Sequence, residues 1–156
     1  MLVRVLAAAA LLGFTTASIA QGPPGNTPLK AGSATLLLDG KKVTFDKVQG
    51  YVLESGGSLV VPALVFGPTG GDNLQLSVLV KGPGPVDLAQ PFGNGIAFRK
   101  GGTFFQNEKG KPGCTLTVTR ISRTEIEGTA ECPTLKELNG SRTLSVTGVK
   151  FSAKAG

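Results

Sequence analysis

The 156-residue chain contains no histidine and no tryptophan, and it has only two cysteines and one tyrosine. Without histidine, neither a Ser-His-Asp nor a Cys-His catalytic arrangement can form. A zinc site is not expected either, because it needs about four nitrogen or sulfur ligands. The lack of tryptophan argues against a platform that stacks sugar rings or nucleic-acid bases. These absences remove most catalytic and metal-binding chemistries.

Glycine is abundant, with 23 residues, but the glycine-rich segments do not match phosphate-binding motifs. Gly40-Lys41 is followed by Lys42 instead of Ser or Thr, and GPGPVD and GNGIAF each break G-x-G-x-x-G at its last position. The segment 70–73 lacks the further acidic residues of a calcium loop. We therefore expect turns at these glycines, with no cofactor and no bound metal.

The first residues have the order of a secretory signal peptide. Arg4 is followed by an apolar run over 5–14 and by a small-residue end at Ala20, which predicts cleavage of residues 1–20. The apolar run is shorter than the roughly 20 residues of a membrane span. No cysteine lies near the cleavage point, so no lipid anchor is expected there. The sequence predicts an exported protein, periplasmic or extracellular, without a membrane span in its mature part.

The formal net charge of +6 is spread along the chain. No basic stripe interleaved with aromatic residues appears, so nucleic acid is not an expected partner. The densest basic region, which Glu108 interrupts, is a candidate rim for contacting an anion, and its ordinary alternative is a solvated loop. Its members are Arg99, Lys100, Lys109 and Lys111.

The alternation of apolar and polar residues predicts strands and not helices. In the segment 73–80, Leu74, Leu76, Val78 and Val80 face one way. Short strands of this kind recur at the spacing of a sandwich or barrel. We predict a Pro/Gly-rich flexible tail over 21–32 and one all-β domain over 33–156. Its fold is a single antiparallel β-sandwich or flattened barrel of about 8–9 short strands.

Local signals place several turns and irregularities. Asp39-Gly40 suits a type I′ hairpin turn that pairs Ala34 with Phe45. Pro62 marks a sheet edge or a bulge, and a bulge at Gly148 would keep the apolar residues on both sides of it on the core side. The segment 133–138 is the one candidate helix, because Thr134 and Glu137 have capping-box spacing. The phenylalanines of the mature chain, Phe104 among them, are assigned to the core.

The two cysteines, Cys114 and Cys132, bracket a predicted hairpin and are expected to form a disulfide. Pairing them across the hairpin sets Leu116 against Ala130 and Arg120 against Ile126, with a three-residue turn at 122–124. The alternative, a redox or metal pair, has the wrong spacing. The same register puts three carboxylates on the outer face, where they are hydrated and not catalytic. They are Glu125, Glu127 and Glu131.

These observations lead to an exported, non-enzymatic binding or structural β module, whose partner is an unknown protein or a component of the cell envelope. Sheet edges that accept a partner strand are one means of binding. One alternative is a small barrel that carries an apolar ligand, as lipocalin-like barrels do. A hydrolase that uses only Lys, Asp, Glu and Ser is the third reading.

Overall fold

The structure is a computed structural model, and it describes residues 25–90 and 93–156. All regular elements in these residues are β-strands, and every pairing between them is antiparallel. The strands are β1 (Thr27–Leu38), β2 (Lys41–Phe45), β3 (Val48–Ser55), β4 (Ser58–Phe66), β5 (Asn73–Val80), β6 (Gly84–Pro85), β7 (Gly95–Lys100), β8 (Thr103–Gln106), β9 (Thr115–Ile121), β10 (Glu125–Glu137) and β11 (Thr143–Ala155).

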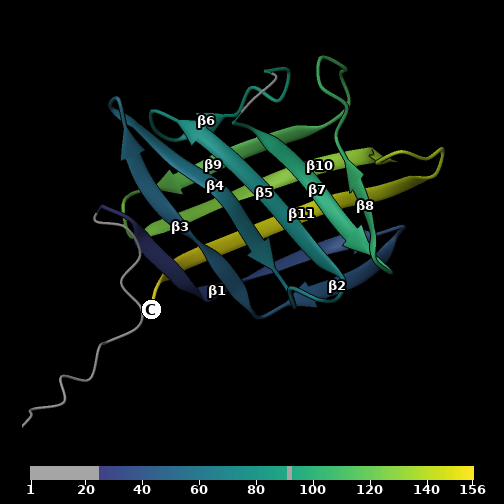
Figure 1. Ribbon diagram of the computed structural model, residues 1–156, viewed down its shortest axis with the longest axis horizontal. Coiled ribbons are helices and arrows are strands. Elements are labelled where there is room, and N and C mark those ends of the chain that lie inside the picture. The colour runs from purple at the N-terminus through teal and green to yellow at the C-terminus, as the bar shows by residue number, and fades with distance from the viewer. Residues whose placement is uncertain (1–24, 91–92) are drawn as a thin grey trace, which may run out of the picture.

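The strands form one sheet that closes on itself. Its order is β11-β1-β3-β4-β5-β7-β8-β10, and β10 also pairs with β11, which completes a ring. β2 is attached to β1, and β9 with the short β6 is attached to β10. Figure 1 shows two layers: β3, β4, β5 and β7 cross over β1, β11, β10 and β9. The fold is therefore a flattened barrel with the layers of a sandwich.

The predicted all-β antiparallel fold is confirmed. Residues 25–90 and 93–156 contain eleven strands, more than the number expected, and one of them, β6, is only two residues long. The core lies between the two layers, where Phe66 of β4 packs against Phe151 of β11 with ring centroids 6.0 Å apart. Leu74, Leu76 and Val78 of β5 are fully buried, as their alternation predicts, and Val80 packs at the margin of the core.

The β1–β2 hairpin has the predicted turn and register. Asp39 and Gly40 have φ values of 48° and 77°, the positive values of a type I′ turn. Ala34 pairs with Phe45 and Leu36 with Val43. The hairpin is thus specified by its own residues.

Both predicted irregularities are bulges. The β4–β5 ladder shifts register between Val61 and Leu64, so Pro62 sits in a bulge of a central strand and not at an edge. The ladders of β11 with β1 and with β10 both shift at Gly148, whose φ is 57°. The bulge keeps Val146 and Val149 buried on the same side, as expected.

The start of the first strand differs from the prediction. β1 begins at Thr27, so the expected tail over 21–32 is a strand from there on, and residues 1–24, with the predicted signal peptide, lie outside the described residues. Leu29 anchors this part of β1, because it is 1% exposed and pairs with β3 and β11. A side chain at Gly32 would collide with the carbonyl of Ser152, so this glycine allows close pairing and does not mark a loop.

The candidate helix over 133–138 is wrong. These residues continue β10 as far as Glu137, because β10 pairs with β11 on one side and with β8 on the other. Leu135 is fully buried there. The assignment of Phe104 to the core is also corrected: Phe104 is 38% exposed, and Phe105 takes the inward position of β8. Long-range pairing outweighs the local signal in both cases.

The cysteine hairpin follows the predicted register over most of its length. Leu116 pairs with Ala130, Val118 pairs with Gly128, and residues 122–124 form the turn. The ladder then shifts by one residue, so that Arg120 pairs with Glu127 and not with Ile126. The shift lets Ile121 face Ile126 and moves Arg120 outward, where its guanidinium lies 3.8 Å from the Glu127 carboxylate.

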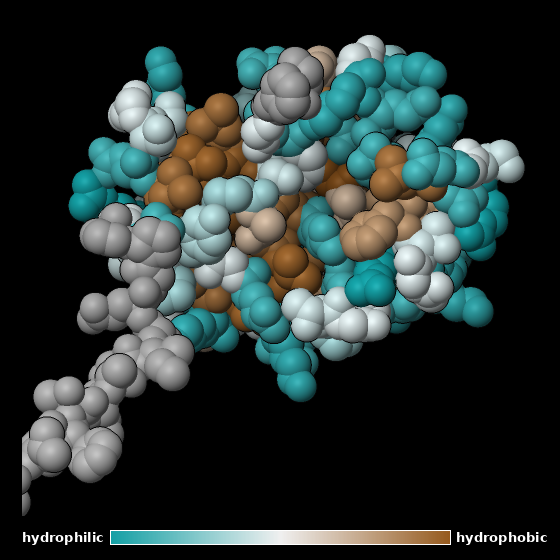
Figure 2. Space-filling model, in the orientation of Figure 1, coloured by the Kyte–Doolittle hydropathy of each residue, from teal (hydrophilic) through white to brown (hydrophobic). Residues whose placement is uncertain are grey.

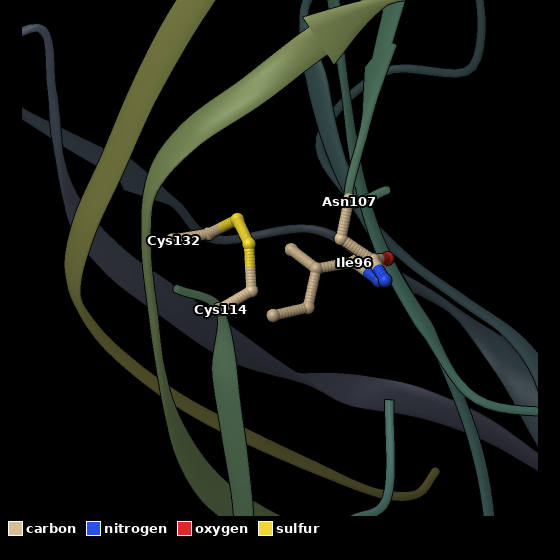
Figure 3. The surroundings of a disulfide bond; sticks show 4 residues. All are labelled: Ile96, Asn107, Cys114 and Cys132. Atoms are coloured by element: carbon tan, nitrogen blue, oxygen red, sulfur yellow. A yellow bond between two sulfur atoms is a disulfide. The ribbon is translucent and has the colours of Figure 1, made fainter. Parts of the chain in front are cut away.

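Cys114 and Cys132 form the expected disulfide. Cys132 is 1% exposed and belongs to the core. Figure 3 shows the side chain of Ile96, from β7 in the other layer, pointing toward the two sulfur atoms. The disulfide therefore forms part of the packing between the layers, in agreement with a structural role.

Replacement of both Cys114 and Cys132 by serine is expected to lower the free energy of unfolding by roughly 3 kcal/mol, because the unfolded chain is then no longer cross-linked. Urea unfolding followed by far-UV circular dichroism measures the loss, since the chain lacks tryptophan. A reactive thiol in the folded wild-type protein would contradict the disulfide. Loss of ligand binding at unchanged stability would instead mean that the cysteines form a site.

Candidate binding groove

A groove with a volume of about 320 Å³ lies on the outer face of the layer that contains β4, β5 and β7. Its floor is β7, where Gly95 and Ala97 point outward and leave room above the strand. Gln75 and Ser77 of β5 form one wall. The other wall comes from β8 and the segment that follows it, and its residues are Gln106, Asn107 and Lys109.

The bulge of β4 widens the groove. Pro62 and Ala63 lie where the β4–β5 ladder is interrupted, and both line the groove. Neither carries a long side chain that would cover the neighbouring strand. The proline that marks the bulge in the sequence thus contributes to the shape of this surface.

Two buried asparagines terminate the hydrogen-bond ladders on either side of β7. Asn94 is 5% exposed, and its Oδ1 accepts a hydrogen bond of 2.6 Å from the backbone N–H of Leu79, beyond the last β5–β7 pair. Asn107 is 4% exposed and bonds Ile96 twice: its Oδ1 accepts from the Ile96 N–H at 2.8 Å, and its own N–H donates to the Ile96 carbonyl at 3.0 Å. The side chains replace backbone partners that would otherwise be missing.

The Asn107 amide has a further donor. Its Nδ2 makes no hydrogen bond within residues 25–90 and 93–156, and the residue lines the groove. The Nδ2 atom is not among the described buried atoms that lack a hydrogen-bond partner, which indicates that solvent reaches it. The Nδ2 group is therefore a donor that a bound molecule can satisfy.

Three polar atoms converge on the floor at Gly95. A Cβ at this position would lie 3.5 Å from Asn107 Oδ1, 3.6 Å from Lys109 Nζ and 3.7 Å from Ser77 Oγ. These distances are ordinary contacts, so the absent side chain leaves a small polar cradle. Gly95 does not have a positive φ. Neither the backbone conformation nor close packing thus requires glycine here, and the cradle is open because this position has no side chain.

Lys109 supplies the charge of the groove. Its Nζ donates a hydrogen bond to the carbonyl of Asn94, which holds the ammonium against the floor. Among the described residues no carboxylate lies within 4.0 Å of it, and its neighbour Glu108 pairs with Lys111 and Lys136. None of the described residues that line the groove is a carboxylate. The groove therefore presents one positive charge among neutral amide and hydroxyl groups.

An apolar row borders the groove on the same face. Leu53, Val60 and Leu79 are direct cross-strand neighbours on β3, β4 and β5, and Leu79 is 39% exposed. Figure 2 shows apolar surface over the ends of β3 and β4 that lie at the upper left of this view. Polar surface separates this area from other apolar spots on the face.

The structure separates the four basic residues that the sequence singles out. Arg99 donates to the Thr69 carbonyl at 2.8 Å and lies over the Phe104 ring, and Lys100 pairs with Asp39 at 3.1 Å. Both stand at the end of β7 opposite to Gly95, whereas Lys109 contacts the groove floor. Lys111 pairs with Glu108. Of the four residues, only Lys109 lines the groove.

Charged residues at the end of the fold that contains the β1–β2 turn are paired with one another. A hollow of about 540 Å³ there is lined by Asp39, Lys100 and Arg142, among others. Arg142 bonds both carboxylate oxygens of Glu137 and also the Thr103 hydroxyl. This pairing lowers the pKa of Glu137 below its ordinary value. The ion pairs neutralise this end, which leaves it less suited to a charged ligand.

The carboxylates of the cysteine hairpin have structural contacts. Glu125 and Glu127 lie near Arg120, and both oxygens of Glu131 accept hydrogen bonds of 2.9 Å from the Gly148 N–H. Glu131 thus satisfies the backbone group that the β11 bulge leaves free. Within the part of the chain that the structure describes, no three acidic or cysteine side chains gather as metal ligands.

Comparison of the chain with protein-family models, with curated proteins and with solved structures finds no match. Among the described residues, no helix has the length and apolar character needed to cross a membrane. The case for a function therefore rests on the chemistry of this surface.

Sequence reasoning missed most of the groove. Asn94 and Gly95 belong to the GNGIAF segment, which predicts only a turn, and Asn107 carries no local signal. Lys109 is singled out by the charge pattern, but its position beside Gly95 depends on how β7 and β8 pair. The one available signal is the pair of small outward residues, Gly95 and Ala97, on a strand that otherwise alternates as expected.

Asp39 makes stability depend on pH. Its pKa lies below its ordinary value because its carboxylate accepts hydrogen bonds from the Ser145 N–H and from Lys100. A lowered folded-state pKa contributes stability above the unfolded pKa of about 3.9, and this stability is lost as the pH falls through the folded value. Asp39→Asn is expected to cost about 1 kcal/mol or less at pH 7, because the pair with Lys100 is exposed.

Urea unfolding at pH 7 and at pH 3 tests this dependence. The difference between wild type and Asp39→Asn should shrink at the lower pH, which lies below the unfolded-state pKa of about 3.9, so that part of the stability from the charged carboxylate is lost. Asp46→Asn is the matched control, since Asp46 forms none of the described salt bridges. A difference that is equal at both pH values would show that the charge of Asp39 is not the cause.

Proposed function

We propose that this protein is an exported, non-enzymatic binding module whose site is the groove above Gly95. The observation that carries the proposal is the convergence of Ser77, Asn107 and Lys109 on a position without a side chain. Polar groups that converge in a hollow on a rigid sheet are typical of a site for a small molecule. Ser77 belongs to β5 of the closed ring, and Asn107 and Lys109, which follow β8, are hydrogen-bonded to Ile96 and Asn94, so the three groups are held in place before a ligand arrives.

Export is supported by the disulfide together with the signal-like first 20 residues. Disulfides persist in oxidising compartments such as the periplasm and the cell exterior. A ligand met in either compartment would come from the medium or from the cell envelope.

The outer groove is a better site than the interior of the ring. The space between the layers is occupied by large side chains that are fully buried, such as Phe66, Phe98 and Leu74. An apolar ligand inside the barrel would have to displace them, and interiors at this density do not open without a large cost. The interior thus offers less support to the lipocalin-like alternative than the groove offers to a polar ligand.

Most sheet edges are less suited to receiving a partner strand, because closure of the ring pairs both sides of its main strands. Among the strands that the structure describes, β2 pairs with β1 alone, and the first two residues of β2 are lysines. Lysine at an edge opposes the addition of another strand.

The groove also contains the residues that a Ser-Lys hydrolase would need, namely Ser77 and Lys109. No hydrogen bond joins the two side chains among the described contacts, and the Lys109 ammonium instead donates to the Asn94 carbonyl. A general base must be able to accept the proton of the hydroxyl group. This arrangement favours binding over turnover.

Gly95→Val tests the groove. A valine at this position would fill the polar cradle, and it suits the extended backbone of β7. A library of polar small molecules can be screened by ¹H–¹⁵N NMR, with chemical shifts followed at Gly95, Ala97 and Asn107. Molecules that bind the wild type there are expected to lose at least about tenfold in affinity with Gly95→Val, which corresponds to about 1.4 kcal/mol.

Gly70→Ala is the matched control. Gly70 lacks a positive φ and has open space around its Cβ position, and it lies outside the groove. It should bind like the wild type, and circular dichroism should show that both variants fold. Library molecules that bind Gly95→Val as well as the wild type would place the site elsewhere. Their chemical conversion by the wild type, and not by Ser77→Ala, would favour the hydrolase.

A further inference from the structure

We infer that the groove captures a ligand through a carboxylate group. The carboxylate pairs with the Lys109 ammonium and accepts hydrogen bonds from Asn107 Nδ2 and Ser77 Oγ. This inference rests on the proposed function, and it names the chemical class of the ligand. A carboxylate accepts several hydrogen bonds and carries a single negative charge. Beside Gly95, the Lys109 ammonium and the Ser77 hydroxyl are donors, whereas the Asn107 atom nearest to this position is Oδ1, which already accepts the Ile96 N–H. The Nδ2 group of the same amide is the third donor.

The charge balance of the groove supports an anion. Lys109 is the one charged residue among the groove-lining residues, and no described carboxylate pairs with it. Its contact with the Asn94 carbonyl uses one of the three N–H donors of the ammonium. The remaining two donors are available to a ligand oxygen. A charge-assisted hydrogen bond of this kind is about twice as strong as a neutral one.

The donor set favours a carboxylate over a phosphate. Phosphate carries close to two negative charges at neutral pH and is typically bound by arginine clusters or by several backbone N–H groups. The groove offers one lysine and no arginine. Its floor at Gly95 is also narrow, with the three polar atoms within 3.7 Å of one point.

The rest of the ligand should be polar and free of negative charge. Away from the Gly95 cradle, the walls carry the amides of Gln75 and Gln106, which flank Ala97 across three paired strands. The Gln75 Nε2 group already donates to Asn73 at 2.9 Å, which leaves its oxygen as an acceptor. Hydroxyl or amide groups of a ligand match such walls. A sugar acid and the C-terminus of a short peptide both carry this chemistry.

Titration of the full mature protein by ¹H–¹⁵N NMR tests the inference with four organic probes. D-glucuronate is compared with D-glucose, and N-acetyl-alanyl-alanine with its C-terminal amide. At least one acid should shift the amide signals of Gly95, Asn107 and Lys109 and should bind at least about tenfold more tightly than its neutral analogue. The acid that binds identifies the source of the carboxylate. Inorganic phosphate should bind more weakly than that acid.

Lys109→Gln and Lys111→Gln form a matched pair of variants. Each substitution removes one positive charge, and the two lysines are separated by a single residue. Lys111, however, pairs with Glu108 and lies outside the groove. Lys109→Gln should reduce affinity for the acid about tenfold or more and leave the neutral analogue unchanged, whereas Lys111→Gln should leave both unchanged. Equal losses in the two variants would indicate a general effect of charge and would overturn the inference.

The outcomes separate this inference from the proposed function. One outcome would support the proposed function but contradict the carboxylate. In that outcome, neutral probes or library molecules bind the groove, Gly95→Val abolishes their binding, and Lys109→Gln does not alter it. Tighter binding of phosphate than of either acid would also overturn the inference that the ligand carries a carboxylate. If none of these molecules shifts the signals of the groove residues, both the function and the inference fail.

Discussion

The pairing of β11 on both of its sides is the constraint on which the rest of the structure depends. β11 joins β1, the first strand, to β10, and this closes the ring. Both ladders shift at Gly148, so a single bulge must serve two partners at once. Glu131 on β10 accepts the N–H that the bulge leaves unpaired. The closure joins the two ends of the domain, and it therefore forms by contacts between residues far apart in the sequence.

Closure of the ring also explains why a polar groove can exist on a small sheet. The β5–β7 ladder ends at the pair Ser77–Gly95, and the β7–β8 ladder ends at the pair Ala97–Gln106. A backbone N–H beyond these pairs would cost free energy if it were buried without a partner. Asn94 and Asn107 supply the missing acceptors. The backbone carbonyl of Asn94 receives the Lys109 ammonium at the groove floor, and the Asn107 nitrogen makes none of the described hydrogen bonds.

The parts of the fold that depend on neighbouring residues were predictable. The Asp39-Gly40 turn, the bulge at Gly148 and the cysteine hairpin follow from turn chemistry and alternation. The start of β1 at Thr27 was not predictable in this way, because a Pro/Gly-rich segment becomes a strand only when β3 and β11 pair with it. The extension of β10 through residue 133 has the same cause, since β8 and β11 complete its ladders.

The candidate site was less predictable than the fold, because its residues come from three separate segments, namely β5, β7 and the segment after β8. Ser77, Gly95, Asn107 and Lys109 meet only after β5, β7 and β8 have paired. The charge pattern identified Lys109 but grouped it with Arg99 and Lys100, which the extended β7 carries to its other end. A run of charges in the sequence is thus a poor guide to a surface when a strand separates its members.

Ile96 links the stability of the core to the geometry of the groove. Its side chain is 1% exposed and points toward the disulfide, while its backbone N–H and carbonyl both bond Asn107 (Figure 3). Gly95 and Ala97, on either side of it, face outward and form the groove floor. The packing that holds Ile96 inward therefore also sets the height of the floor and the position of the Asn107 amide. A well-packed interior keeps such a strand rigid, so the same contacts that stabilise the ring place the polar atoms of the groove.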